Sequence, residues 1–281
     1  MQLDSECLSL EEIEKRLTTR IIGRSPNPNE VWAEIGSTNT RAAELAAAGA
    51  VEGVFVAARQ QSAGRGRLGR TWVSPMDSGI YLSVILKPLD FSSSDLAPIT
   101  LACGVAASRA IEKSVGIRLG LKWVNDLVYE GRKLGGILAE MPGAGAATDP
   151  AKRALIVGFG LNLRKGSQPV PEELEQKMGW LEQIAGAPLG SNAIAAQLLA
   201  EIEAVYEQLK AKKSDEILSE WRTRSVTLGR DIMATSGTSQ IRGTAIDIDN
   251  SGALLVQSAQ GQIHHIHAGE VSIRSSDGKY I

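Results

Sequence analysis

Histidine and cysteine are scarce in this chain, and their scarcity excludes several kinds of active site. The 281 residues include three histidines, at positions 264, 265 and 267, and two cysteines. Residues 1–225 contain no histidine, which excludes a Ser-His-Asp or Cys-His nucleophile system there. A usual zinc site is not expected, because no cysteine cluster is present and His264 and His267 would lie on opposite faces of a strand. Cys7 and Cys103 provide no disulfide framework and fit a reducing cytoplasm.

The chain also lacks a large charge excess and any long apolar run. Its 30 basic and 32 acidic residues give a formal net charge of −2, whereas a protein that binds duplex DNA needs a basic surface. No run approaches the ~18 apolar residues that a membrane span needs. Residues 1–20 lack the basic start and apolar core of a signal peptide. We therefore expect a cytoplasmic protein that binds neither DNA nor membrane.

The periodicity of apolar residues predicts two unequal domains. Residues 1–225 are expected to form the large domain, in which 1–30 are a short helix and a linker, and residues 226–281 a small β-barrel. Strands in neighbouring hairpins between helices predict the class α+β, with a mainly antiparallel central sheet flanked by helices. Strands are expected at 31–35, 54–58, 80–86, 119–123, 127–129, 134–141 and 154–163, helices at 9–22, 37–49, 95–114, 191–211 and 214–223, and a loop at 142–150.

The most informative segment is Gly64–Arg70, which contains three arginines and three glycines directly after an expected strand. Glycine lets a ligand approach the backbone N–H groups closely, and arginine offers a charged fork that fits phosphate or carboxylate. The segment predicts a cradle for an anionic ligand, and a flexible basic loop or an RNA contact is the alternative. A P-loop is excluded, because no Gly-x-x-x-x-Gly-Lys-Ser/Thr motif is present. The chemistry that remains is phosphoryl or nucleotidyl transfer, assisted by Arg, Lys, backbone N–H groups and Mg²⁺.

Five motifs taken together resemble the biotin–protein ligases of bacteria and archaea, over about residues 31–275. They occur in the order Ser37-Thr38-Asn39, Gln61 with Gly64–Arg70, Lys122–Asp126, Lys133–Leu138 and Gly158–Asn162. The C-terminal segments Gly252–Leu255 and Gly269–Arg274 resemble that family's SH3-like barrel.

The resemblance implies a two-step reaction. Biotin and ATP with Mg²⁺ would give biotinyl-5′-adenylate and pyrophosphate, and a lysine of a biotin carboxyl carrier protein, from acetyl-CoA carboxylase or a related carboxylase, would then take the biotin. About thirty residues precede Val31, so we expect a monofunctional ligase without the N-terminal DNA-binding domain of bifunctional members. The family often has proline where this chain has Val124. This difference removes no functional group. Both a monomer and a homodimer stay open.

The resemblance also assigns residues. Arg67 and Lys133 would be catalytic, as cations that bring the biotin carboxylate and the α-phosphate together. Asp126 would help to hold Mg²⁺, and Gly158 would let the strand backbone approach the ligand. Biotin would contact Ser37, Thr38, Asn39, Gln61, Gly64, Arg65, Gly66, Arg67, Lys133, Gly136 and Gly160, and ATP or the adenylate would contact Arg65, Arg67, Arg70, Trp123, Asn125, Asp126, Lys133, Asn162 and Trp180.

Each of these assignments has an alternative in which the residue has only a structural role. Ser37 also fits a plain helix cap, Lys133 an exposed hairpin lysine, and Asp126 a turn aspartate. Trp32, Trp72 and Trp221 are predicted to be structural. For the whole chain, a lipoate–protein ligase is the runner-up enzyme, and a biotin-sensing transcriptional regulator or an RNA-binding RG protein are the non-enzyme alternatives.

Overall fold

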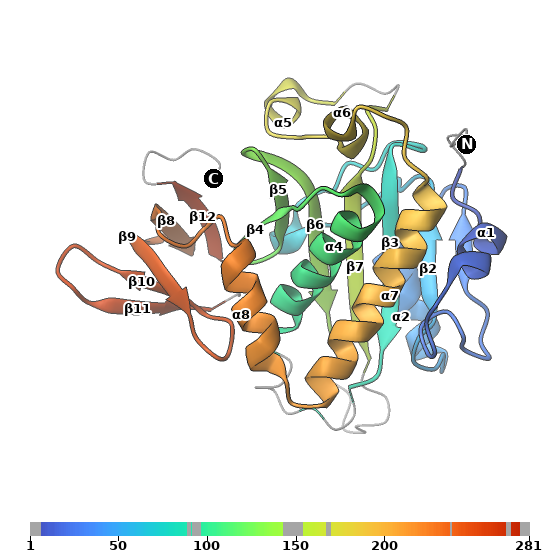
Figure 1. The fold of residues 1–281 in the computed structure, drawn as a ribbon, viewed down its shortest axis with the longest axis horizontal. Helices are drawn as coiled ribbons and strands as arrows, with labels where there is room; N and C mark the ends of the chain where they lie inside the picture. The colour runs from blue at the N-terminus through green and yellow to red at the C-terminus, as the bar shows by residue number, and fades with distance from the viewer. Residues whose placement is uncertain are drawn as a thin grey trace.

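The structure is a computed structural model that describes residues 7–88, 91, 97–142, 154–166, 170–236, 238–267 and 271–275. A seven-stranded sheet forms the centre of the large domain (Figure 1). All of its strand pairs are antiparallel except β1–β2, so the predicted α+β class with a mainly antiparallel sheet is confirmed. In spatial order the strands are β1 (Glu30–Trp32), β2 (Phe55–Ala58), β3 (Gly79–Leu86), β7 (Leu155–Asn162), β6 (Arg132–Glu140), β5 (Asp126–Tyr129) and β4 (Gly120–Lys122).

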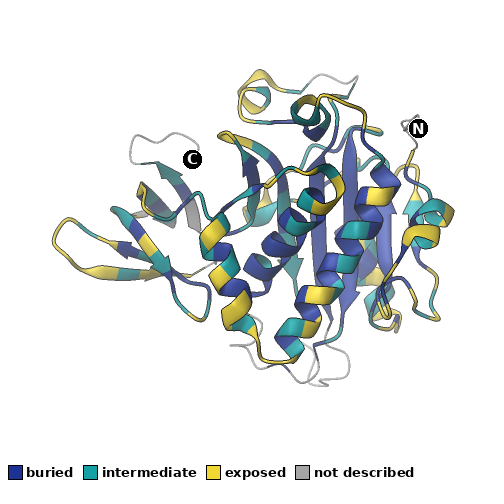
Figure 2. Cartoon of the chain, viewed as in Figure 1, coloured by how far each residue is buried: buried dark blue, intermediate teal, exposed yellow. Residues whose placement is uncertain are grey.

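Helices cover both faces of this sheet. The helices α4 (Ile99–Val115) and α7 (Ser191–Lys210) pack together on one face, with α8 (Ser214–Arg224) against α4 (Figure 1). The helix α2 (Thr38–Ala47) packs against β2, β3 and β7 on the other face. The central strands are therefore buried on both sides, and every residue of β3 and β7 is buried (Figure 2). A polar residue that faces α2 on these strands has no contact with bulk solvent.

The predicted helices and strands of the large domain are present with shifted ends. The first helix, predicted at 9–22, is α1 (Leu10–Arg16), because the backbone turns extended at Leu17. The helix predicted at 95–114 begins at Ile99, directly after Pro98. The short helices α5 (Glu172–Glu175) and α6 (Leu181–Ala185) were not predicted. Most of the predicted loop 142–150 lies outside the described residues.

A carboxylate on α7 holds the segment that follows α1. Glu203 accepts hydrogen bonds from the backbone N–H groups of Arg20, Ile21 and Ile22, each at 2.8 Å. Arg20 and Ile21 are exposed and Ile22 is buried, and an unmade bond to a buried backbone group costs free energy, so Glu203→Ala should lower the free energy of unfolding by about 1 kcal/mol. Urea unfolding measures this. Glu207→Ala on the same helix removes only a surface pair with Lys210 and should cost under about 0.5 kcal/mol; equal losses would contradict this role of Glu203.

The C-terminal segment forms a separate small antiparallel sheet, consistent with the predicted SH3-like domain. Its core includes Ile232, Ala245, Leu254 and Val256. The residues Gly269 and Glu270 of the predicted motif lie outside the described residues. In spatial order the strands are β11 (Ile263–Ile266), β10 (Leu254–Gln257), β9 (Ser239–Ile248), β8 (Asp231–Ser236) and β12 (Val271–Ser275).

Two hydrogen bonds from Trp123 join this sheet to the large domain. The backbone N–H of Trp123 donates to Thr227 Oγ1 at 2.9 Å, and the indole Nε1 donates to Gly252 O at 3.0 Å. His265 of β11 lies 3.0 Å from Asp249 Oδ2 and is exposed. His267 follows the end of β11. His264 and His267 therefore do not lie on opposite faces of one strand, as was predicted, because His267 is not part of the strand.

Candidate active site

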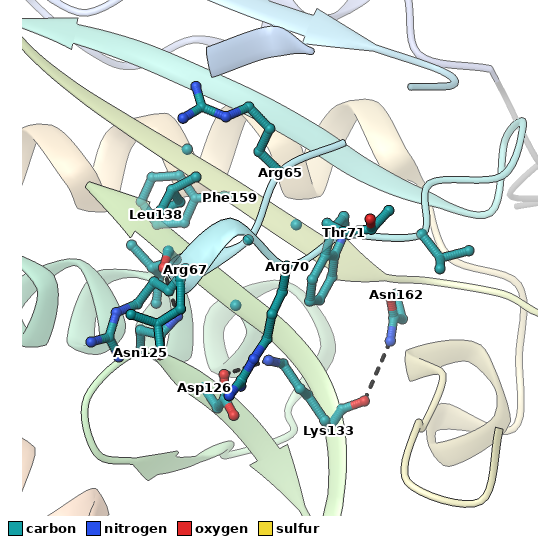
Figure 3. A pocket seen from close by; sticks show the side chains of 18 of the residues that line it. Arg65, Arg67, Arg70, Thr71, Asn125, Asp126, Lys133, Leu138, Phe159 and Asn162 are labelled. Atoms are coloured by element: carbon teal, nitrogen blue, oxygen red, sulfur yellow. Dashed lines mark hydrogen bonds and ion pairs between the residues drawn. The ribbon is translucent and has the colours of Figure 1, made fainter. Parts of the chain in front are cut away.

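A cleft of about 360 Å³ lies beside the carboxyl half of β7 and brings the predicted site residues together (Figure 3). Its walls come from the start of α2, the segment 65–73, the strands β4 to β7, the segment 174–178 and β12. Gly64 and Trp180 are the two predicted contact residues that do not line it. Those that do are Ser37, Thr38, Asn39, Gln61, Arg65, Gly66, Arg67, Arg70, Trp123, Asn125, Asp126, Lys133, Gly136, Gly160 and Asn162.

The Arg-Gly segment is a folded hairpin. The N–H of Trp72 donates to Gly64 O at 2.9 Å, and the N–H of Gly66 donates to Arg70 O at 2.7 Å. A 3₁₀ turn forms its tip, and the backbone of Leu68 in this turn is left-handed (φ 59°). Gly64 is required by this hairpin, because a Cβ there would lie 2.3 Å from Trp72 O. The segment therefore has a defined backbone conformation, as a cradle for a ligand requires.

Neutral polar groups gather at one end of the cleft. Gln61 Oε1 accepts from the N–H of Thr38 at 2.8 Å and from its hydroxyl at 3.2 Å. Ser83 Oγ donates to Asn39 Oδ1 at 2.6 Å and lies 2.8 Å from Thr38 Oγ1. Ser37 caps α2 by accepting from the N–H of Thr40. This end offers donors and acceptors that are fixed by one another and carry no charge.

Positive charge gathers at the other end. Seven of the residues that line the cleft are arginine or lysine, and one further lining residue, Asp126, has a carboxylate side chain. Burial lowers the pKa of Arg67, whose Nη1 lies 3.4 Å from Asn125 Oδ1. Such an uneven and partly desolvated set favours a ligand with several negative charges. The seven basic residues that line the cleft are Arg65, whose side chain pairs with Glu140, and Arg67, Arg70, Lys122, Lys133, Lys177 and Arg274.

Lys133 and Asp126 form an ion pair inside this positive region. Lys133 Nζ lies 2.5 Å from Asp126 Oδ1, and both side chains are largely buried, at 26% and 15% exposure. Arg70 lies beside the pair, whereas Arg65 extends in the opposite direction (Figure 3). The interpretations of Lys133 as an exposed hairpin lysine and of Asp126 as a plain turn aspartate are therefore wrong. Because Asp126 neutralises only one neighbouring cation, the region stays positive.

Asn162 connects β6 to the segment that ends at Gly179, which forms a further wall of the cleft. Its Nδ2 lies 3.3 Å from both Lys133 O and Gly179 O, and it is buried. The N–H of Lys133 in turn donates to Lys177 O at 2.7 Å. The segment that follows α5 is thus held against β6. Leu174 of α5 and Met178 of this segment line the cleft, and neither apolar residue was predicted from the sequence.

Trp72, predicted to be structural, lines the cleft instead. A Cβ on Gly160 would lie 2.4 Å from its indole ring, and Lys133 Nζ lies 5.2 Å from its ring centre. Its Nε1–H is buried and has no hydrogen-bond partner among the described residues. The glycine at 160 therefore makes room for this ring. The signal in the sequence was the position of Trp72 two residues after Arg70.

The other tryptophans differ in their surroundings. Trp180 is 8% exposed and precedes α6 outside the cleft lining, so its contact with a nucleotide stays a prediction. Trp123 is buried and lines the cleft. Trp221 is fully enclosed in the core, and Trp32 is 41% exposed.

Lys122 also lines the cleft, although the sequence analysis gave it no role. It is 3% exposed. Burial lowers its pKa from 10.5 to about 7, with Asp126 opposing the shift and the neighbouring cations adding to it. A desolvated ammonium that is charged at low pH destabilises the folded state.

We therefore expect Lys122→Met to raise the free energy of unfolding at pH 7 by about 2 kcal/mol. Because the folded pKa lies below the unfolded one, the cost of Lys122 is complete below about pH 7 and fades as the pH rises towards 10.5. Urea unfolding at pH 7 and pH 10 should show a gain at pH 7 that nearly disappears at pH 10. A gain of the same size at both values would contradict titration of Lys122 as its cause.

No group of three or more His, Cys, Asp or Glu side chains in the described part of the chain could hold a metal ion. No helix among those residues is long and apolar enough to cross a membrane.

Comparison with known proteins gives consistent matches. Residues 32–149 match the Biotin/lipoate A/B protein ligase family, and residues 227–274 match the Biotin protein ligase C terminal domain. The biotin–[acetyl-CoA-carboxylase] ligase of Mycobacterium tuberculosis is 32% identical over 92% of this chain and 94% of its own length. The bifunctional ligase/repressor BirA of Bacillus subtilis is 31% identical over 95% of this chain and 79% of its own length.

Solved structures agree. The biotin protein ligase from Aquifex aeolicus in complex with biotin and ATP superimposes with a TM-score of 0.75 at 30% identity, covering 88% of this chain and 99% of that chain. The biotin protein ligase from Leishmania major in complex with biotinyl-5-AMP, at 23% identity and a TM-score of 0.55, shares the fold over 86% of this chain and 99% of that one.

Proposed function

The chain belongs to the biotin protein ligase family, and we propose that the neutral end of its cleft binds biotin and the positive end binds ATP. The protein is an ATP-dependent ligase that forms biotinyl-5′-adenylate from biotin and ATP and then transfers biotin to a carboxylase. The observation that carries the residue assignment is that uncharged polar groups lie at one end of the cleft, whereas Arg67, Arg70, Lys133 and the carboxylate Asp126 lie at the other.

At the neutral end, the ureido ring of biotin needs an acceptor for each N–H and a donor for its carbonyl. Ser37, Thr38, Asn39 and Gln61 provide such groups, and their mutual hydrogen bonds fix their orientation before the ligand arrives. The ring of Trp72, packed over Gly160, supplies an apolar wall for the rest of the biotin.

At the positive end, the biotin carboxylate attacks the α-phosphorus of ATP. A bond forms between a carboxylate oxygen and the α-phosphorus, and the bond from the α-phosphorus to the oxygen that bridges to the β-phosphate breaks, so that this oxygen leaves with pyrophosphate. Two anions must approach one another, so Arg67 and Lys133 would neutralise both the carboxylate and the charge that develops on the α-phosphate. Arg70 would face the departing pyrophosphate, and Trp123, Asn125 and Asn162 would border the adenylate.

Mg²⁺ enters with ATP as its co-substrate. It prefers a few carboxylates together with phosphate oxygens, and Asp126 is the carboxylate among the lining residues. Since Asp126 also pairs with Lys133, most ligands of the ion would come from phosphates.

In the second step the ε-amine of a lysine attacks the carbonyl of the mixed anhydride, and AMP leaves with the bonding electrons. The acceptor we propose is the biotin carboxyl carrier protein of acetyl-CoA carboxylase or a related carboxylase, a proposal that the similarity to the biotin–[acetyl-CoA-carboxylase] ligase of M. tuberculosis supports. The near-neutral charge and the two cysteines support a cytoplasmic protein that does not bind DNA.

The test is biotin-dependent exchange of labelled pyrophosphate into ATP by the purified protein with Mg²⁺, with lipoate and octanoate as parallel substrates. We expect exchange with biotin alone. Exchange with lipoate or octanoate instead would show that the chain has the activity of a lipoate–protein ligase. No exchange with any of them would overturn the adenylation step.

Arg67→Gly tests the role of the partly buried arginine. It should leave a folded protein, because Arg67 lies in an exposed turn of the backbone, but should speed the release of biotinyl-adenylate about 10- to 100-fold by loss of a charge-assisted contact. Released adenylate would then label lysines of an unrelated protein added to the reaction. Arg67→Lys keeps a cation and should restore part of the retention. If Arg67→Gly holds the adenylate as tightly as the unaltered protein, Arg67 is not a ligand.

A further inference from the structure

Glu140, at the end of β6, connects two parts of the cleft without lining it. Its two carboxylate oxygens have different partners. Oε1 accepts from Arg65 Nη2 at 2.6 Å, and Oε2 accepts from Asn39 Nδ2 at 3.0 Å. One side chain thus contacts both the Arg-Gly hairpin and the neutral polar end of the cleft.

The contact with Asn39 fixes which way its amide points. Asn39 is buried, and its Nδ2 lies between two acceptors, Glu140 Oε2 and Leu138 O. Its Oδ1 accepts from Ser83 Oγ at 2.6 Å. Since a carboxylate accepts and cannot donate, Glu140 excludes the flipped amide, in which Oδ1 would face two acceptors.

The contact with Arg65 fixes the hairpin. The Arg65 side chain extends away from Arg70 and Lys133 (Figure 3), towards the end of β6. Its ion pair with Glu140 therefore joins the hairpin to the central sheet, and the same hairpin carries Arg67 and Arg70 into the positive end. A hairpin that swings outward would withdraw both arginines from the ligand.

We infer that Glu140 is a positioning residue that holds the Arg65–Arg70 hairpin closed over the adenylate and orients Asn39 towards biotin. This inference rests on the proposed binding of biotin and ATP in the cleft. It assigns Arg65 mainly to closure of the hairpin and leaves the direct contacts with anions to Arg67, Arg70 and Lys133.

The experiment separates the two arms of Glu140. Glu140→Gln keeps an acceptor for Asn39 but removes the charge that binds Arg65, and Arg65→Met removes the same pair from the other side. Because the Arg65 side chain is 49% exposed, we expect each change to speed release of biotinyl-adenylate by about fivefold. The double variant should equal either single one, because both remove one interaction.

Glu140→Ala removes both arms, so it should raise the KM for biotin more than Arg65→Met, which removes only the contact with the hairpin. Glu130→Gln, at the exposed turn between β5 and β6, is the control for loss of one negative charge and should behave like the unaltered protein. Far-ultraviolet circular dichroism and thermal unfolding of each variant show whether it is folded.

Three results would overturn the inference in an otherwise active enzyme: unchanged release from Glu140→Gln, additive effects in the double variant, or equal KM changes in Glu140→Ala and Arg65→Met. If the unaltered protein shows no biotin-dependent exchange, the proposed function fails instead, and the two failures are thereby distinguished. Should Glu140→Ala fail to fold, the comparison of Glu140→Gln with Arg65→Met still decides whether the pair closes the hairpin.

Discussion

Lys133→Ala should reduce the rate of biotin-dependent pyrophosphate exchange at least ~10²-fold, as expected when a preorganised charge contact is lost from a transition state. The ammonium lies in a low-exposure part of the cleft, 2.5 Å from Asp126 and 5.2 Å from the ring centre of Trp72. In that setting a charge acts more strongly than in water. Its removal also leaves Asp126 without this partner, so the carboxylate would repel the phosphates that Lys133 attracts.

The effect should appear mainly in kcat, because the charge on the α-phosphate grows as the carboxylate attacks. Lys133→Arg should recover part of the rate by restoring the charge, though not the compact geometry of an ammonium. Lys113→Ala is a matched control, since Lys113 is 61% exposed and pairs with Glu201 away from the cleft. A rate for Lys133→Ala close to that of Lys113→Ala would remove Lys133 from the reaction.

The sequence predicted the strands and most cleft residues because their signals are local. Alternation and apolar runs mark β3 and β7, and the motif at 64–70 joins glycine and arginine within one turn of chain. By contrast, Ser83 and Glu140 carry no motif of their own. Ser83 occurs inside an apolar strand and becomes a cleft support only because the sheet register places it beside α2.

Long-range register also explains the interpretation of Trp72 that failed. Its surroundings depend on Gly160, which is a neighbour of the hairpin only after β3, β7 and β6 have paired. The length of the first helix could not be read from periodicity either. Leu17 continues the apolar pattern, but the chain leaves the helix there and uses Glu203 of α7 for its next N–H groups. In both cases a tertiary partner decides between locally equivalent structures.

Gly158→Ala should weaken binding of biotin at least ~10²-fold, the loss expected when buried polar ligand groups are displaced. A Cβ on residue 158 would lie 1.9 Å from Asn39 Oδ1 and 2.8 Å from its Cγ. The strand cannot easily retreat, because Gly158 pairs with Ser83 on one side and with Leu138 on the other. The Asn39 side chain must therefore move, and it loses its contacts with Ser83 and Glu140.

Isothermal titration with biotin measures the effect, and Gly36→Ala is its control, since a Cβ there would meet nothing within 4 Å. Asn39→Ala identifies the cause. If the glycine acts by making room for Asn39, adding Gly158→Ala to Asn39→Ala should change biotin affinity little further, because the clash no longer exists. Additive losses would mean that the new methyl group blocks biotin itself or distorts β7. Unchanged affinity in Gly158→Ala alone would show that Asn39 can leave its position without affecting the ligand, and would remove it from the set of biotin contacts.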